Sequence, residues 1–253
     1  MTDRLRVFSI ILLLSFVSPA LADESISLKQ GYLMLKPSGQ FAADAATAGT
    51  RVDMATDMGL GQSNGSITEL AVQLEDSRFS VAYLPIRLDG AGILNRNVNF
   101  NGTVYAANAT INSSMQLDMI DLAYTYFLLN MDDLPSRTQL GVQASLKIVQ
   151  AELALANVTT GASQSVSQTV PIPTIGLYGR VALADFLGLN GRVQYISVAG
   201  NRLLDADVQI EFSPMPMAGI YGGYRQMDIK LSASGLYADA KLSGPYFGAM
   251  VRF

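Results

Sequence analysis

The feature that most constrains the fold is a hydrophobic pattern of period two, repeated along most of the chain. In Leu204–Phe212, five apolar residues alternate with four polar or charged ones. Gln139–Ile148 and Glu69–Glu75 alternate in the same way. Successive side chains of a strand point to opposite faces, so each stretch predicts a β-strand with one apolar and one polar face.

Turn signals rich in Gly, Pro, Asn and Asp divide these stretches into about ten predicted strands, or eight if two short stretches are wrongly split. The predicted strands lie near 25–36, 66–76, 78–88, 114–130, 137–156, 169–184, 189–199, 203–213, 217–231 and 242–253. Short connections mostly alternate with long ones, and the long ones are predicted over 37–65, 89–113, 157–168 and 232–241. This rhythm is typical of a transmembrane antiparallel up-and-down β-barrel, with tight turns on one side and loops on the other.

Several of the predicted strands change phase midway, for example at Met119-Ile120 and at Val149-Gln150. A change of phase exchanges the apolar and the polar face of a strand. We interpret both positions as β-bulges or as places where strands rise above the bilayer.

The N-terminal residues have the anatomy of a secretory signal peptide. Two arginines precede an apolar stretch over 7–17, and the small residues Ala20 and Ala22 follow it. The apolar stretch is too short to span a membrane as a helix. We therefore predict a cleaved signal peptide over 1–22 and a single mature domain over 23–253.

Composition excludes several classes of function. The chain of 253 residues has 49% hydrophobic residues, a net charge of −4, and no His, Cys or Trp. An acidic chain without basic runs is not expected to bind nucleic acid. The missing His and Cys exclude most zinc and haem sites, thiol nucleophiles and Ser-His triads. We expect no cofactor, no metal and no catalytic residue, since Asp205 and Asp207 are more simply explained as polar groups of a barrel interior.

The last strand carries the most specific motif. Phe247, Ala249, Val251 and Phe253 alternate with less apolar residues and end on a terminal aromatic residue. This resembles the final strand of Gram-negative outer-membrane barrels, in particular small barrels of the OmpX and OmpW type. The resemblance implies that the strand is an assembly signal read by the outer-membrane assembly machinery. It also implies a location in the bacterial outer membrane, contact with membrane lipid and lipopolysaccharide, and a monomeric barrel.

If the apolar faces lie against lipid, the opposite faces line the lumen. In a barrel of ~8–10 strands the interior is about wide enough for side chains to fill it. The candidate lumen residues have matched signs, so ion pairs that plug the barrel are favoured over an open pore. The candidates are Glu69, Glu75, Arg87, Asp121, Lys147, Arg180, Arg192, Asp205, Asp207, Glu211, Arg225 and Arg252.

Three functions are compatible with these sequence features. The first is a structural or loop-mediated binding role, with contacts made by the connections over 37–65, 89–113 and 157–168. The alternative is a narrow passive channel for small or apolar solutes, and the third is an outer-membrane enzyme. A soluble periplasmic β-protein, which would bury its apolar faces in a core, is the competing fold.

Overall fold

The structure is a computed structural model that describes residues 24–43, 50–131, 137–215, 217–233 and 236–253. The predicted signal peptide, 1–22, lies outside the described residues. Over the described residues, no helix is long and apolar enough to cross a membrane.

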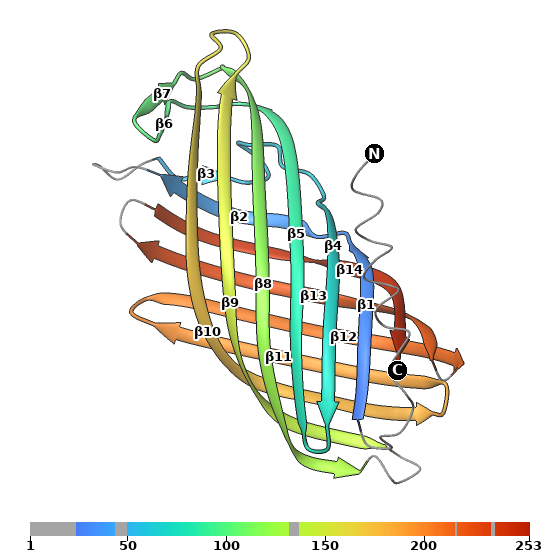
Figure 1. Ribbon diagram of the computed structural model, residues 1–253. Coiled ribbons are helices and arrows are strands. Elements are labelled where there is room, and N and C mark those ends of the chain that lie inside the picture. Colours follow the sequence, from blue (N-terminus) through green and yellow to red (C-terminus); the bar gives the residue numbers. More distant parts are fainter. Residues whose placement is uncertain (1–23, 44–49, 132–136, 216, 234–235) are drawn as a thin grey trace, which may run out of the picture.

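The described residues form a closed antiparallel barrel in which each wall strand lies beside its neighbour in sequence (Figure 1). The last strand returns to the first, with Ser27 opposite Arg252, and this pairing closes the barrel. The prediction of an all-β, up-and-down barrel is thus confirmed, with ten strands in its wall rather than eight. The wall strands are β1 (Glu24–Leu33), β4 (Asn64–Leu74), β5 (Ser77–Ile93), β8 (Thr110–Met131), β9 (Thr138–Asn157), β10 (Ser163–Ala184), β11 (Leu187–Val198), β12 (Asn201–Met215), β13 (Ala218–Ala233) and β14 (Leu236–Arg252).

The first wall strand is longer than predicted and is interrupted once. β2 (Lys36–Ala43) continues β1 along β14 in the same register, since Leu33 lies opposite Tyr246 and Lys36 opposite Ser243. Pro245 lies between these pairs and has no N–H to donate, which accounts for the break in the ladder. β3 (Val52–Asp53) then pairs with the other edge of β2. The predicted long connection over 37–65 therefore contains two short strands.

Two other predicted loops are mostly strand. β10 begins at Ser163, inside the stretch expected to be a loop over 157–168, and β13 and β14 together occupy most of 232–241. The Ser and Thr residues of the first stretch favour a loop, but Val166 and Val170 alternate with them and pack inward. The connection over 89–113 contains a separate hairpin of β6 (Val98–Phe100) and β7 (Thr103–Tyr105).

The polarity of the two barrel faces inverts halfway along the strands. We define the upper end as the one that carries the β2–β3 and β5–β8 connections, and both termini of the barrel lie at the lower end. On β8, Ile111, Met115 and Leu117 are inward apolar residues above Met119, whereas Asp121 and Thr125 are inward polar residues below it. The outward residues change in the opposite sense, from Asp118 above to Leu122 below.

The inversion occurs without a change of register. Met119 lies directly opposite Val149, and the β8–β9 ladder shifts only lower down, between Phe127 and Leu129. The phase changes in the sequence are therefore not bulges. They mark the level at which each strand exchanges its apolar and polar faces.

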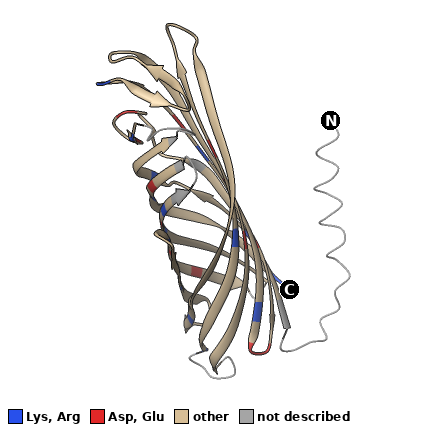
Figure 2. Ribbon diagram, turned by 90° about the vertical axis from the view of Figure 1, so that its left-hand side faces the viewer, with Lys and Arg blue, Asp and Glu red and all other residues tan. Residues whose placement is uncertain are grey.

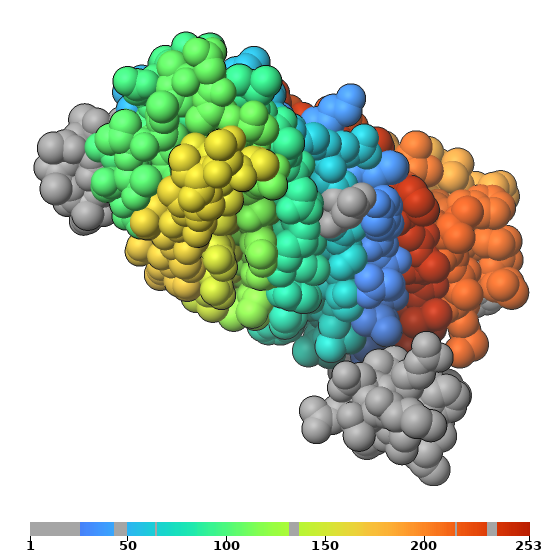
Figure 3. Space-filling model, turned by 90° about the horizontal axis from the view of Figure 1, so that it is seen from above, coloured from blue at the N-terminus to red at the C-terminus, as the bar shows by residue number. Residues whose placement is uncertain are grey.

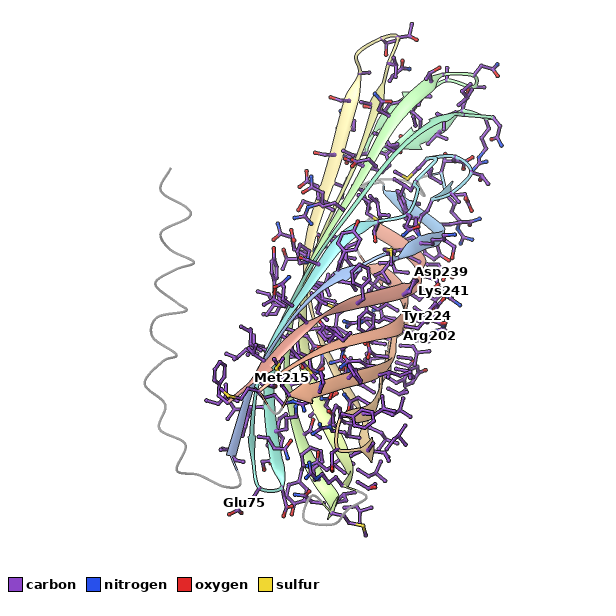
Figure 4. All side chains as sticks on the ribbon, turned by 90° about the vertical axis from the view of Figure 1, so that its right-hand side faces the viewer. Glu75, Arg202, Met215, Tyr224, Asp239 and Lys241 are labelled. Atoms are coloured by element: carbon purple, nitrogen blue, oxygen red, sulfur yellow. The ribbon has the colours of Figure 1, made fainter. Side chains whose placement is uncertain are left out.

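All ten wall strands invert at about the same level. Below it the interior is mainly polar and the outside mainly apolar; above it the interior is mainly an apolar core and the outside is mainly polar. The outward residues above this level include Arg202 on β12 and Asp239 and Lys241 on β14. These three residues lie far from Glu75, which is in the β4–β5 turn at the lower end (Figure 4). The first large inward apolar residues above the boundary are Leu33, Ile67, Leu84, Met119, Val149, Ile172, Ile196, Leu203, Met227 and Leu242.

Candidate functional site

The centre of the interior is crossed by a cluster of four charged side chains. Lys147 on β9 places its Nζ 2.5 Å from Asp121 Oδ2 on β8 and 2.8 Å from Asp205 Oδ2 on β12. Arg225 on β13 binds the same Asp205 through two N–H groups, at 2.9 and 2.7 Å. None of these four side chains is more than 1% exposed. The central cluster, as we call these four residues, links opposite walls of the barrel.

A second carboxylate lower in the barrel gathers three cations. Glu211 on β12 accepts a hydrogen bond from Lys29 at 2.7 Å and also contacts Arg252 of the last strand. Arg180 on β10 lies 3.6 Å from the same carboxylate. These contacts join the first, the last and two middle strands of the wall.

A third group connects β4, β5 and β11. Arg78 donates a hydrogen bond to Glu69 at 2.7 Å, and Arg192 lies 4.0 Å from the other oxygen of that carboxylate. Asp207 accepts a hydrogen bond from the Tyr246 hydroxyl at 2.8 Å. Every inward acidic residue in the described part of the wall thus has a cation or a hydroxyl group as a partner.

The charges of the interior are not fully matched in number. Among the described inward residues, seven are cationic and five are acidic, an excess of two positive charges. Two cations also lie over aromatic rings: the Arg78 guanidinium is 5.1 Å from the Tyr178 ring centre, and Lys29 Nζ is 5.6 Å from that of Tyr221. Such contacts stabilise a cation without a second carboxylate. The seven cations are Lys29, Arg78, Lys147, Arg180, Arg192, Arg225 and Arg252, and the five acids are Glu69, Asp121, Asp205, Asp207 and Glu211.

Between these groups lies a small cavity of about 30 Å³, lined in part by Glu69, Asn190, Arg192 and Tyr221. Asn190 Oδ1, Arg192 Nε and the Tyr221 hydroxyl are buried without a protein hydrogen-bond partner. A space of this size has room for only one or two water molecules. Around this cavity, charged and polar side chains from several strands approach one another within the polar half of the interior.

The upper half of the interior is a packed apolar core covered by the long connections. The Phe41 and Phe100 rings meet edge to face with centres 6.5 Å apart, which joins β2 to the β6–β7 hairpin. Met54 and Met58, from the segment after β3, are fully buried in this core. Seen from above, the green segment that contains β6 and β7 lies beside the yellow β9–β10 tip (Figure 3). We call the segments 50–63 and 94–109 the lid.

Polar contacts stabilise a turn within the lid and also join the lid to the barrel wall. Asp53 Oδ1 accepts hydrogen bonds from the Ala55 and Thr56 backbone N–H groups, at 3.0 and 2.8 Å. The Thr56 N–H bond to the ionised carboxylate lowers the pKa of Asp53. The buried hydroxyl of Tyr105 donates to the Leu155 carbonyl of β9, and burial raises the pKa of that phenol.

Most, but not all, of the predicted lumen residues point inward. Arg87 is the exception within the wall: it lies on the outer face of β5 and binds Asp118 of β8 through two hydrogen bonds. It lies above the level of inversion, where the inward positions are apolar, so a polar side chain belongs outside. Glu75 lies exposed in the β4–β5 turn. The inward residues are Glu69, Asp121, Lys147, Arg180, Arg192, Asp205, Asp207, Glu211, Arg225 and Arg252.

Two inward cations, Lys29 and Arg78, are absent from the set predicted from the sequence. Arg78 is the second residue of β5, at its lower end, and Lys29 lies in the middle of β1. Arg78 alternates with Ser80 and Ala82, neither of which marks a polar face by itself. The apolar residues Phe79 and Val81 mark the outward face of this strand, and a period of two then places Arg78 on the inward face.

Comparisons with known proteins locate the fold but no family: no family model and no curated protein matches the sequence. The outer membrane protease OmpT from Escherichia coli has a similar structure, with a TM-score of 0.61 and 13% identity over 94% of this chain and 99% of that one. Neisserial surface protein A has a TM-score of 0.40 and 14% identity, over 91% and 97% of the two chains. Ail of Yersinia pestis has a TM-score of 0.39 and 11% identity, over 92% and 100%.

The fold is that of a small outer-membrane β-barrel. At this level of identity the likeness defines the architecture and does not assign an activity. In the described part of the chain, no group of three or more acidic residues is arranged to hold a metal ion.

Proposed function

We propose that this protein is a β-barrel of the outer membrane of a Gram-negative bacterium, with a closed interior and a structural or binding role carried by its upper end. The buried ion pairs of the central cluster and the apolar core above them are the observations that carry the proposal. Its partners would be membrane lipid and lipopolysaccharide around the wall and the assembly machinery during insertion, and the barrel would act as a monomer. The last strand supports recognition by that machinery, since Phe247 and Val251 point outward and alternate with inward residues.

The outer surface of the lower half supports the membrane location. Its large apolar side chains are widely exposed, for example Phe79 at 50%, Ile175 at 69% and Phe247 at 56%. Among the described residues, the outward positions of this belt carry no charged side chain. An exposed apolar belt of this extent is unfavourable in water, and lipid removes the penalty.

The interior supports a scaffold in preference to a pore. A permeating solute would have to displace the central cluster, whose charges are buried and mutually paired, and then the apolar core above it. Separating buried ion pairs is costly because each charge is left in a medium of low dielectric constant. The charged central cluster would also hinder apolar solutes, and the apolar core above it would hinder polar ones.

Conductance of the purified, refolded protein in a planar bilayer tests this proposal. We expect a silent membrane, with folding shown by a gel mobility that changes on heating. Arg192→Ala and Arg180→Ala are expected to raise conductance, because both side chains occupy the polar half. The exposed Lys241→Ala is the matched control. Discrete openings of the unaltered protein would contradict a closed interior.

A narrow channel is the second candidate. The excess of two positive charges in the interior favours it, because a channel for anions presents an excess of positive charge. Under this alternative, the unaltered protein would open in discrete steps and prefer chloride to potassium, and Arg192→Ala would weaken that preference.

We propose no catalytic role. Asp205 is bound by two cations and Asp207 by a tyrosine hydroxyl, so the two carboxylates do not share a proton as a hydrolytic pair would. Hydrolysis of a lipid or peptide substrate that is lost in Asp205→Asn or Asp207→Asn would contradict this.

A further inference from the structure

The upper part of β10 has a partner on one side only. Its ladder with β9 runs without interruption from Ser163 to Val181. Its ladder with β11 starts only at Ile175, which lies opposite Tyr195. The strands diverge above this pair (Figure 1), because β11 continues along β12 to Val198. The stretch 163–174 is therefore a strand edge without a neighbouring strand among the described residues.

This edge lacks the charges that usually protect an exposed strand. No charged residue occurs between Glu152 and Arg180, and the upper part of this hairpin shows neither blue nor red in Figure 2. Exposed edges are normally blunted by charged side chains, by proline or by a bulge, because unpaired N–H and C=O groups are a template for another strand. Pro171 and Pro173 are the protective residues present, and both lie at the lower end of the edge.

The two prolines also define which backbone groups face outward from the ladder. Proline is accommodated in a sheet where its nitrogen faces away from the neighbouring strand. N–H groups alternate in direction along a strand, so those of Ser165, Ser167 and Thr169 face the same free side. The stretch 163–170 is thus paired with β9 on one side and open to a partner strand on the other.

One contact already uses this edge. Asn101, at the tip of the β6–β7 hairpin, donates a hydrogen bond from Nδ2 to the Ser165 carbonyl at 3.2 Å. The same amide reaches Gln164 Oε1 at 3.3 Å. A side chain thus occupies one acceptor of the edge, where a strand would supply a backbone N–H.

The apolar core is incompletely covered beside the edge. Val166 and Val170 of β10 and Ile196 of β11 pack against the core but remain partly exposed. They are the inward residues of the two strands that diverge. Every second side chain of a strand added to β10 would point inward and cover these three residues. The other side chains of the added strand would point outward, beside Ser165, Ser167 and Thr169.

From these observations we propose that the 163–170 edge of β10 binds an extended polypeptide segment by β-strand addition. The segment alternates apolar and polar residues and is uncharged where it pairs. Backbone hydrogen bonds supply most of such an interaction, and the alternate side chains supply selectivity. The inference depends on the proposed function only in placing this edge outside the cell.

A second copy of the chain in the same membrane does not fit this edge. Antiparallel pairing of two β10 edges requires a twofold axis perpendicular to the barrel wall, which would turn the second barrel upside down. Parallel pairing requires an axis along β10, and because barrel strands are tilted by ~35–45°, it would tip the second barrel by about 80°. The partner is therefore a different polypeptide.

Binding of a synthetic peptide to the folded protein in detergent tests the proposal. The probe is a capped peptide of alternating valine and threonine, as long as the 163–170 stretch, with lysines outside its ends. We expect saturable binding, with slower amide hydrogen exchange at Ser165, Ser167 and Thr169. Val166 and Gln168 already face β9, so their exchange should not change.

Two substitutions at one position separate backbone pairing from side-chain contact. Ser167→Pro removes an edge N–H and should weaken binding by about tenfold, whereas Ser167→Ala keeps that N–H and should bind within about twofold. The chain already accommodates proline at equivalent positions, and heat-dependent gel mobility checks that each variant folds. Absence of binding, or equal binding to both variants, would overturn the proposal. Neither result depends on whether the barrel conducts ions, so this failure is distinct from failure of the proposed function.

Discussion

Replacing Lys147 by methionine is the sharpest test of a dry, closed interior. Lys147 Nζ contacts the carboxylates of Asp121 and Asp205, and its side chain is fully buried. Methionine has a similar length and suits a buried site, so the change removes the charge with little change in volume. Asp205 keeps its two hydrogen bonds from Arg225, but Asp121 loses the cation that binds it.

The expected loss of unfolding free energy is about 3–5 kcal/mol, the range found when one partner of a buried ion pair is removed. The loss arises because a carboxylate remains in the interior without compensation. Adding Asp121→Leu to Lys147→Met removes that carboxylate as well. The double variant should recover to within about 1 kcal/mol of the unaltered protein, because apolar residues often replace a buried pair without loss.

The assay is reversible urea unfolding in lipid vesicles, analysed as a double-mutant cycle. Lys241→Met is the control, since this exposed lysine lies on the outer face of β14, and it should change stability by no more than about 0.5 kcal/mol. A loss below about 1 kcal/mol for folded Lys147→Met would show that water reaches the central cluster. The interior would then be hydrated, and a closed barrel would be refuted.

Three further predictions concern the upper half and its lid. Leu84→Ala should cost about 2–5 kcal/mol in urea unfolding because Leu84 is fully buried in the core, whereas the outward-facing Leu122→Ala should cost less because lipid fills the space. Arg87→Ala should cost at most about 1 kcal/mol in the same assay, since the side chains of this outer ion pair are 39% and 29% exposed. The lowered pKa of Asp53 implies that its turn is fully stabilised above the unfolded pKa of ~3.9 and loses stability as pH falls through the lower folded value. A lower protection factor of the Thr56 amide in acid, corrected for the slower intrinsic exchange at low pH, would show this, and Asp53→Asn should remove the pH dependence of that protection.

The alternation of residues determines the barrel, and hence strand number and order are predictable. For Leu204–Phe212, each residue faces the side that the period of two indicates. Loop boundaries are less predictable because small residues occur in both turns and strands. The Ser and Thr residues of the stretch 163–170 favour a loop, although its two valines already alternate as in a strand.

The interior is only partly predictable, for two physical reasons. Assigning every apolar face to lipid works below the level of inversion and fails above it, which is why the sequence pattern predicts the wrong face for Arg87. Contacts across the lumen also depend on how the sheet closes. Nothing in the local sequence around Lys147 indicates that its ammonium reaches Asp205 on the opposite wall.

The inversion of polarity means that the two halves of each wall strand suit different surroundings. The outer surface of the lower half is apolar and suits lipid, and its interior is stabilised by ion pairs. The outer surface of the upper half is polar and suits water, and its interior is stabilised by an apolar core. The boundary between these regimes coincides with the central cluster, so in the proposed outer-membrane location this cluster would lie level with one surface of the membrane. A change in bilayer thickness would therefore affect the two halves unequally. It would alter the solvation of the lower wall and leave the upper core intact. The central cluster, which lies between the two halves, would be the part of the interior most strained by this difference.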